Sequence, residues 1–194
     1  MNCLIKKIAF ISGATSGLGK ELSINLAKNG YHVLINGKNE NKLNNLYDKI
    51  KLLDGTSTII NLDLNDYEGI DRLGYQIYKK YKKLDLLIMN AAILGTLSPL
   101  CHQEPKEFET VINTNLIVNF RLLRSLELSL KKSKNGELCV ISSNLTKNPK
   151  PFWGAYSVSK AALEQMIYSW HLENKQSNVK IYIIHPKPIN TKLR

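Results

Sequence analysis

Short apolar runs alternate with helical stretches along the whole chain. Six runs are continuously apolar or alternate apolar with polar residues, and they predict strands over residues 5–11, 32–36, 56–62, 84–89, 137–142 and 179–185. Between them, apolar residues recur every three or four positions, which predicts helices over residues 17–28, 40–53, 66–81 and 105–132 and around Tyr156. Strands separated by helices in this way predict an α/β fold, a doubly wound parallel sheet with helices on both faces in three layers.

Composition narrows the setting of this fold. The chain has 194 residues, of which 43% are hydrophobic and 22% charged, and this fits a single domain, residues 1–194, with a full core. The longest apolar runs are far shorter than the roughly 18 residues of a membrane span, and the start of the chain lacks the pattern of a signal peptide. The 3 cysteines and 4 histidines are widely spaced, which predicts neither a disulfide framework nor a metal site. We therefore expect a cytoplasmic protein that does not act at a membrane.

The net charge of +11 at pH 7 is carried by basic residues spread along the chain rather than gathered in one tract. No aromatic-basic module accompanies this charge, so we expect no nucleic acid partner. A phosphorylated cofactor or an acidic substrate would benefit from the positive field.

A glycine-rich loop lies between the first predicted strand and the first predicted helix. It reads Ser12-Gly13-Ala14-Thr15-Ser16-Gly17-Leu18-Gly19, with glycines where a tight turn and close approach of the backbone to a pyrophosphate are needed. The helix N-terminus that follows supplies free N–H groups and a positive dipole end. We therefore expect a Rossmann-like sheet whose dinucleotide contacts Gly13, Thr15, Ser16, Gly17, Leu18 and Gly19.

The end of the second strand bears on the choice between NAD and NADP. A carboxylate about 20 residues after the glycines usually binds the ribose of NAD, but this chain reads Asn36-Gly37-Lys38-Asn39 there. Lys38 would attract a ribose 2′-phosphate, so NADP is the expected cofactor, with NAD the alternative if Lys38 is an ordinary surface lysine. Asp63, after the third strand, could bind the adenine amine or could cap the helix that begins near Asn65.

Tyr156 and Lys160 stand four residues apart, so they share one face of a helix. A nearby ammonium favours the phenolate form of a tyrosine, whose ordinary pKa is about 10, and so makes it usable as a proton donor and acceptor. Ser143 ends the fifth predicted strand, where its hydroxyl could hold a carbonyl oxygen. These groups suit carbonyl reduction or alcohol oxidation, although a Tyr-x-x-x-Lys pair alone is also common on ordinary helix surfaces.

Taken together, these motifs resemble the short-chain dehydrogenase/reductase family over nearly the whole chain. The family's glycine motif matches Gly13, Gly17 and Gly19, its adenine-contacting aspartate Asp63, and its Asn-Ala-Gly Asn90-Ala91-Ala92. Its catalytic asparagine, serine, tyrosine and lysine match Asn115, Ser143, Tyr156 and Lys160. Its nicotinamide-binding motif near the C-terminus matches Pro186, Ile189 and Thr191. Residues 90–164 are most similar to poorly characterised bacterial members.

The resemblance implies hydride transfer between a nicotinamide and a small-molecule carbonyl or secondary alcohol. Tyr156 would give the proton, Ser143 would orient and polarise the oxygen, and Lys160 would lower the tyrosine pKa and bind the nicotinamide ribose. Asn115 would anchor a water that connects Lys160 to solvent. The helix from Pro105 and the helix of Tyr156 could pair two subunits in a homodimer.

Three departures from the family pattern bear on function. Ala92 replaces a glycine, Lys187-Pro188 replaces the glycine after Pro186, and the sequence stops at Arg194, where family members usually continue into a substrate lid and a last strand. We therefore expect a shortened or naturally reduced fold that lacks both, with weaker exclusion of water from the substrate. The alternative function is a dinucleotide-binding sensor or interaction partner with little or no catalysis. An epimerase or dehydratase fits the glycine spacing less well.

Overall fold

The computed structural model describes residues 7–187, and at its centre lies a sheet of six parallel strands. The strands are β1 Ile8–Ile11, β2 His32–Gly37, β3 Thr56–Asn61, β4 Leu86–Met89, β5 Glu137–Ile141 and β6 Lys180–Ile184. Their order is β3-β2-β1-β4-β5-β6, so the direction of winding reverses between β1 and β4. Ligands of such sheets bind at the carboxyl ends of the strands beside this reversal. The predicted doubly wound α/β fold is confirmed.

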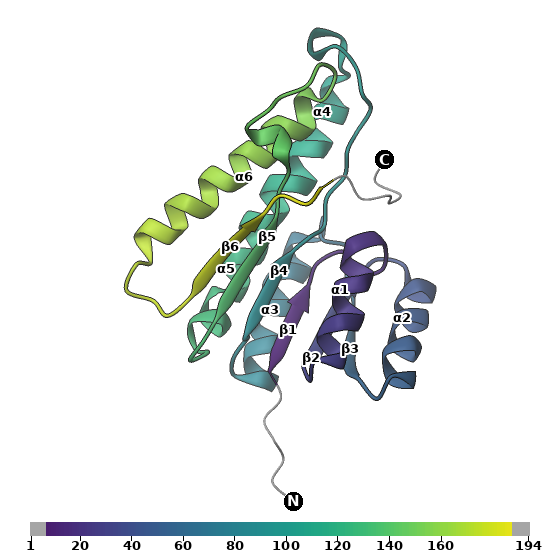
Figure 1. Cartoon of the computed structure of the whole chain (residues 1–194), viewed down its shortest axis with the longest axis vertical. Coiled ribbons are helices and arrows are strands. Elements are labelled where there is room, and N and C mark those ends of the chain that lie inside the picture. Colours follow the sequence, from purple (N-terminus) through teal and green to yellow (C-terminus); the bar gives the residue numbers. More distant parts are fainter. Residues whose placement is uncertain (1–6, 188–194) are drawn as a thin grey trace, which may run out of the picture.

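Helices lie on both faces of the sheet (Figure 1). One core packs α1 Gly17–Lys28 and α2 Glu40–Leu52 against the strands through residues such as Ile24 and Leu46. The other core packs α3 Tyr67–Tyr81, α5 Val118–Lys131 and α6 Gly154–Glu173 through residues such as Leu73, Leu126 and Leu163. The central strands β1 and β4 are buried along their whole length, which explains why their sequences are almost continuously apolar.

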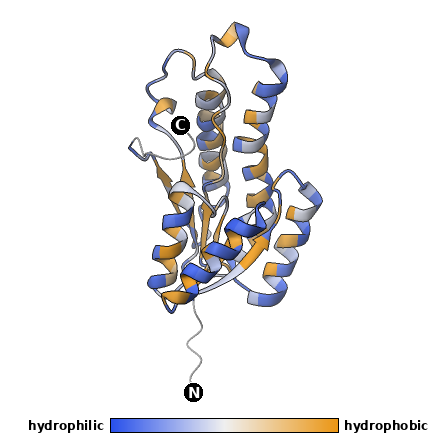
Figure 2. Cartoon of the chain, turned by 90° about the vertical axis from the view of Figure 1, so that its right-hand side faces the viewer, coloured by the Kyte–Doolittle hydropathy of each residue, from blue (hydrophilic) through white to orange (hydrophobic). Residues whose placement is uncertain are grey.

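The hydropathy of the chain follows these layers. Figure 2 shows hydrophobic strands in the middle of the molecule and helices that are hydrophobic on one side and hydrophilic on the other. The exception is β6 at the edge, where Tyr182 and Ile184 keep 45% and 43% of their surface exposed. Within residues 7–187, no helix is both long and apolar enough to cross a membrane.

The predicted helix over residues 105–132 is not one regular helix. It consists of α4 Pro105–Ile112, a π-helical turn at Asn113–Ile117 and α5. Two short 3-10 helices, Leu100–His102 and Asn144–Thr146, lie in stretches for which the sequence predicts no element. The remaining predicted bounds agree with the described elements to within about two residues, apart from β1, which begins at Ile8.

Candidate active site

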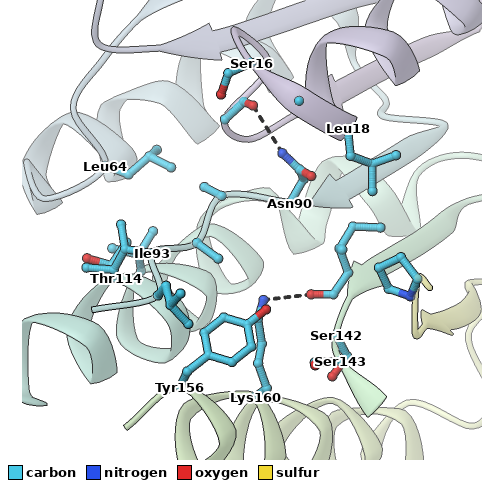
Figure 3. Close-up of a pocket in the computed structure, with 18 of the residues that line it drawn as sticks. Ser16, Leu18, Leu64, Asn90, Ile93, Thr114, Ser142, Ser143, Tyr156 and Lys160 are labelled. Carbon is cyan, nitrogen blue, oxygen red and sulfur yellow. Dashed lines mark hydrogen bonds between the residues drawn. The ribbon is translucent and has the colours of Figure 1, made fainter. Parts of the chain in front are cut away.

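A cavity of about 790 Å³ lies at the carboxyl ends of the strands. Its volume is in the range of small-molecule and cofactor sites. The glycine loop after β1 forms one end, and Tyr156 and Lys160 of α6 rise into the other (Figure 3). Segments that follow β2, β3, β4, β5 and β6 complete the walls, so residues far apart in the sequence meet here.

The glycine loop needs its glycines for two different reasons. Gly13 and Gly17 have φ angles of +64° and +49°, a backbone conformation that costs energy for other residues. Gly19 has an ordinary φ, but a Cβ atom there would lie 2.3 Å from the carbonyl oxygen of Gly13. The loop leads into α1, whose first turn carries no acidic residue and whose N-cap Ser16 makes no side-chain cap hydrogen bond. This close turn and helix N-terminus fit the pyrophosphate of a dinucleotide.

Asn90 holds the glycine loop in place. Its Nδ2 donates to the carbonyl oxygens of Ser12 (3.0 Å) and Gly13 (3.1 Å), and the backbone N–H groups of Asn90 and Ala91 donate to Ser12 Oγ. The segment after β4 is thereby fixed to the segment after β1. Asn90 and Ala91 also line the cavity, so they could act on a cofactor directly and through the loop.

Lys38 and Asp63 lie together at the glycine-loop end of the cavity. The Nζ of Lys38 is 3.9 Å from Oδ2 of Asp63, and both side chains are well exposed. Oδ1 of Asp63 accepts hydrogen bonds from the backbone and side chain of Asn65. The N-cap of α3 is Asp66, whose side chain accepts from Gly69 N. The predicted alternative that Asp63 caps this helix is therefore wrong.

Lys160 is a buried cation beneath Tyr156. Only 2% of Lys160 is exposed, and its Nζ donates to the carbonyl oxygen of Ile141 at 2.8 Å and lies 5.8 Å from the Tyr156 ring centre. Burial disfavours the charged ammonium and lowers the pKa of Lys160 to about 8, although the charge of Glu164 acts in the opposite direction. A group with this pKa can lose and regain a proton near neutral pH.

Tyr156 and Ser143 face the same cavity (Figure 3). The ring of Trp153 meets the ring of Tyr156 edge to face, with centres 6.1 Å apart, which restricts the orientation of the phenol. Ser143 is half-buried, caps the short helix Asn144–Thr146, and accepts a long hydrogen bond of 3.3 Å from Leu145 N. Its hydroxyl proton can therefore be donated to an oxygen in the cavity.

Asn115 lies in the π-helical turn, one layer behind the cavity. Its side chain is fully buried, and its amide bonds the N–H and carbonyl of Ile93 and the hydroxyl of Ser159 at 2.8–2.9 Å. Its backbone oxygen accepts from Asn119 Nδ2 at 2.8 Å. Asn115 thus joins the segment after β4 to α6, and its role in anchoring a water stays a prediction.

The structure brings most of the predicted site residues together. The cavity is lined by Gly13, Thr15, Ser16, Gly17, Leu18, Lys38, Asp63, Asn90, Ala91, Ser143, Tyr156, Lys160 and Pro186. Gly19 and Asn115 support the walls from behind. Ile189 and Thr191 lie outside the described residues.

Sequence reasoning missed an apolar part of the wall around Tyr156. Ile93, Leu94, Leu145 and Trp153 line the cavity there. The positions of Ile93, Leu94 and Leu145 soon after β4 and β5 are a signal that could have indicated them, because ligand-binding segments follow the carboxyl ends of parallel strands. Trp153 lies at the start of α6. Within residues 7–187, no group of three or more His, Cys, Asp or Glu side chains is arranged to hold a metal ion.

Comparison with known proteins agrees with this geometry. The family model described as short chain dehydrogenase matches residues 7–194. An uncharacterized oxidoreductase of Escherichia coli, YciK, is 30% identical over 191 residues, which cover 97% of this chain and 75% of that protein. A 3-oxoacyl-[acyl-carrier-protein] reductase of Buchnera aphidicola, FabG, is 30% identical over 96% of this chain and 75% of its own length.

Solved structures share the fold closely. A short chain dehydrogenase from Pseudomonas syringae superposes with a TM-score of 0.93 at 28% identity, covering 98% of this chain and 81% of that one. One from Shigella flexneri, complexed with NADP, gives a TM-score of 0.90 at 30% identity, covering 97% and 80%. The glycine loop, the parallel sheet and the Tyr156–Lys160 pair thus occur in a chain that belongs to the short chain dehydrogenase family.

Proposed function

We propose that this protein is an NADP-dependent oxidoreductase that interconverts a small-molecule carbonyl and the corresponding alcohol. The observation that carries the proposal is that Ser143, Tyr156 and Lys160 line the same cavity as the glycine loop. A dinucleotide bound along this cavity would extend from the helix N-terminus to the tyrosine. The chain would form one nucleotide-binding domain that also carries the catalytic residues.

When bound, the nicotinamide would supply or accept the hydride. The side chains of the protein transfer the proton and hold the oxygen of the substrate. In the reducing direction, Tyr156 donates its proton to the carbonyl oxygen while Ser143 donates a hydrogen bond to the same oxygen. Lys160 stabilises the phenolate that remains, because a nearby positive charge favours the anionic form. In the oxidising direction the phenolate takes the proton from the alcohol.

Lys38 is the residue proposed to favour NADP. It lines the cavity at the glycine-loop end, and the Asp63 carboxylate 3.9 Å away could hold its ammonium there. A short-chain oxidoreductase from a metagenome, 26% identical to this chain, is also complexed with NADP.

A fluorescence titration should give tighter binding of NADPH than of NADH, and Lys38→Ala should remove the difference. Lys49→Ala, at an exposed lysine near the far end of α2 and outside the cavity lining, should leave it unchanged. Equal affinities in the unmutated protein would sink the preference for NADP.

The proposed reaction is tested with a panel of carbonyls and alcohols, followed by absorbance of NADPH. Tyr156→Phe should keep NADPH binding and lose turnover by about 100-fold or more, because the proton donor is gone. Tyr168→Phe changes an exposed tyrosine of the same helix and should retain activity. Full activity of Tyr156→Phe would contradict the mechanism. NADPH binding without turnover of any compound would favour the dinucleotide-binding alternative.

A homodimer is proposed through α5 and α6. Phe120 and Leu128 on α5, and Tyr168 and Leu172 on α6, are large apolar side chains with 48–60% of their surface exposed. Apolar surface on two long helices is a common basis for association.

Cys101 and Cys139 are free thiols, which supports a reducing, cytosolic setting.

A further inference from the structure

Three polar side chains form a hydrogen-bonded cluster next to the proposed catalytic residues, and one of them, Ser142, also lines the cavity. Oε1 of Glu164 accepts a hydrogen bond from Nε2 of His185 at 2.7 Å and a short one from the hydroxyl of Ser142. Only 7% of Glu164 and 2% of Ser142 are exposed. We call Ser142, Glu164 and His185 the Glu164 cluster. The mechanism above does not use it.

Each member of the Glu164 cluster adjoins a residue of the active site. Ser142 precedes Ser143 at the end of β5, and His185 precedes Pro186 after β6. Glu164 lies on α6 one turn after Lys160. The carboxylate therefore ties the ends of two strands to the helix that carries Tyr156 and Lys160.

The electrostatics of the cluster favour an ionised carboxylate. Burial raises the pKa of Glu164, but hydrogen bonds from Ser142, His185 and Thr146 outweigh it and keep this pKa below its ordinary value. An ionised carboxylate only accepts hydrogen bonds, so Nε2 of His185 must carry the hydrogen. The negative charge of Glu164 in turn raises the pKa of Lys160 against the effect of burial.

We propose that Glu164 is a positioning residue: its carboxylate holds Ser142 and His185, and through them sets Ser143 and Pro186 relative to Lys160. This inference rests on the proposed function, since it assigns a task within the same reaction. Misplacement of reacting groups by about 1 Å costs about 100-fold in rate. A loss of this anchor should therefore lower kcat far more than it weakens cofactor binding, because the glycine loop and Lys38 at the other end of the cavity are left in place.

A second glutamate, partly buried with 34% of its side chain exposed, provides a control outside the site. Glu127 of α5 accepts from Trp170 Nε1 at 3.0 Å and pairs with Lys131 at 2.7 Å, so it also bonds α6. Neither Glu127 nor Trp170 lines the cavity. Glu127→Leu therefore removes a hydrogen bond between α5 and α6 without touching the active site.

The experiment has two independent readouts. The first is kcat and KM with the best compound of the carbonyl panel, together with NADPH affinity by fluorescence. The second is the titration of Lys160 in the cofactor-free protein, followed by carbon-13 NMR of Cε-labelled lysine and assigned by the signal that Lys160→Met loses. The ionisable groups around Lys160 are Tyr156, Glu164 and, through Glu164, His185.

Glu164→Leu, which has no acceptor for Ser142 or His185, should lower kcat by about 100-fold, leave NADPH affinity nearly unchanged, and move the Lys160 titration to lower pH. Glu127→Leu should leave all three at the unmutated values. His185→Leu should lower kcat in the same way, and His185→Gln, which keeps an N–H donor, should restore most of it.

Two results would overturn the inference: an unmutated kcat in Glu164→Leu, or an equal loss of kcat in Glu127→Leu. If the unmutated protein reduces none of the carbonyls, the proposed function fails, and the Lys160 titration still decides whether Glu164 acts on Lys160.

Discussion

Lys160 should make the free energy of unfolding rise with pH above neutrality. Its pKa is about 8 in the folded protein, against 10.5 for an exposed lysine, because burial disfavours the charged form. Between these two values the unfolded chain holds more protons than the folded chain. The free energy of unfolding therefore increases with pH across this window, which is the reverse of a lysine stabilised by an ion pair.

The size of the effect follows from the pKa difference. Each unit corresponds to about 1.4 kcal/mol, so the full window is worth about 3 kcal/mol. Between pH 7 and pH 9.5 the Lys160 contribution should change by about 2 kcal/mol. For a chain of this length, that corresponds to about 4–8 °C in melting temperature.

Urea unfolding of the cofactor-free protein measures this contribution. The unmutated protein and Lys160→Met are unfolded at pH 7 and pH 9.5, and the difference between them isolates Lys160 together with its effect on Tyr156 and Glu164, because more distant groups titrate alike in both. The unmutated protein should gain about 2 kcal/mol relative to Lys160→Met over this range. Lys49→Met, at an exposed lysine of α2, should show no such change. A difference that stays flat with pH would refute a buried, low-pKa lysine.

Further predictions concern turnover, the cofactor loop, the buried asparagine and the dimer. If the reaction requires the cation of Lys160, kcat/KM should fall about tenfold per pH unit above about pH 8. Gly19→Ala should abolish NADPH binding in the fluorescence titration, because its Cβ would lie 2.3 Å from the carbonyl oxygen of Gly13. Asn115→Ala should cost about 3 kcal/mol in urea unfolding, since it removes the three hydrogen bonds of a fully buried amide, two to Ile93 and one to Ser159. Leu172→Lys should convert a dimer into a monomer in light scattering, and its melting temperature should no longer depend on protein concentration.

The fold can be predicted from the sequence because it depends on patterns of neighbouring residues. A strand buried on both faces needs a continuous apolar run, and β1 and β4 show one. Residues that follow parallel strands lie at one edge of the sheet, so the sequence predicts that Asn90, Ser143 and Pro186 lie close together. The glycine loop was readable for the same reason, since its strand and helix neighbours adjoin it in sequence.

Other features of the site depend on contacts between residues far apart in the sequence, which the local sequence pattern does not indicate. Glu164 and His185 are 21 residues apart, and neither the helix pattern around one nor the strand pattern around the other indicates a bond between them. Scattered histidines are usually ordinary loop or strand-end residues, and His185 does follow a strand. Its bond to a buried carboxylate required the three-dimensional structure. The sequence alone does not distinguish Asp63 from Asp66 as the N-cap of α3, because aspartate suits that position at either residue.

At the π-helical turn Asn113–Ile117, the number of residues matters more than which residues they are. A π turn contains one residue more than an α turn, which rotates all that follows by roughly 100° relative to a regular helix. With this rotation, Asn115 faces Ile93 and Ser159, while Val118, Leu122 and Leu126 are buried. Losing a single residue here would turn either the asparagine or the apolar face of α5 away from its partners. We therefore expect insertions and deletions in this segment to be tolerated far less than substitutions.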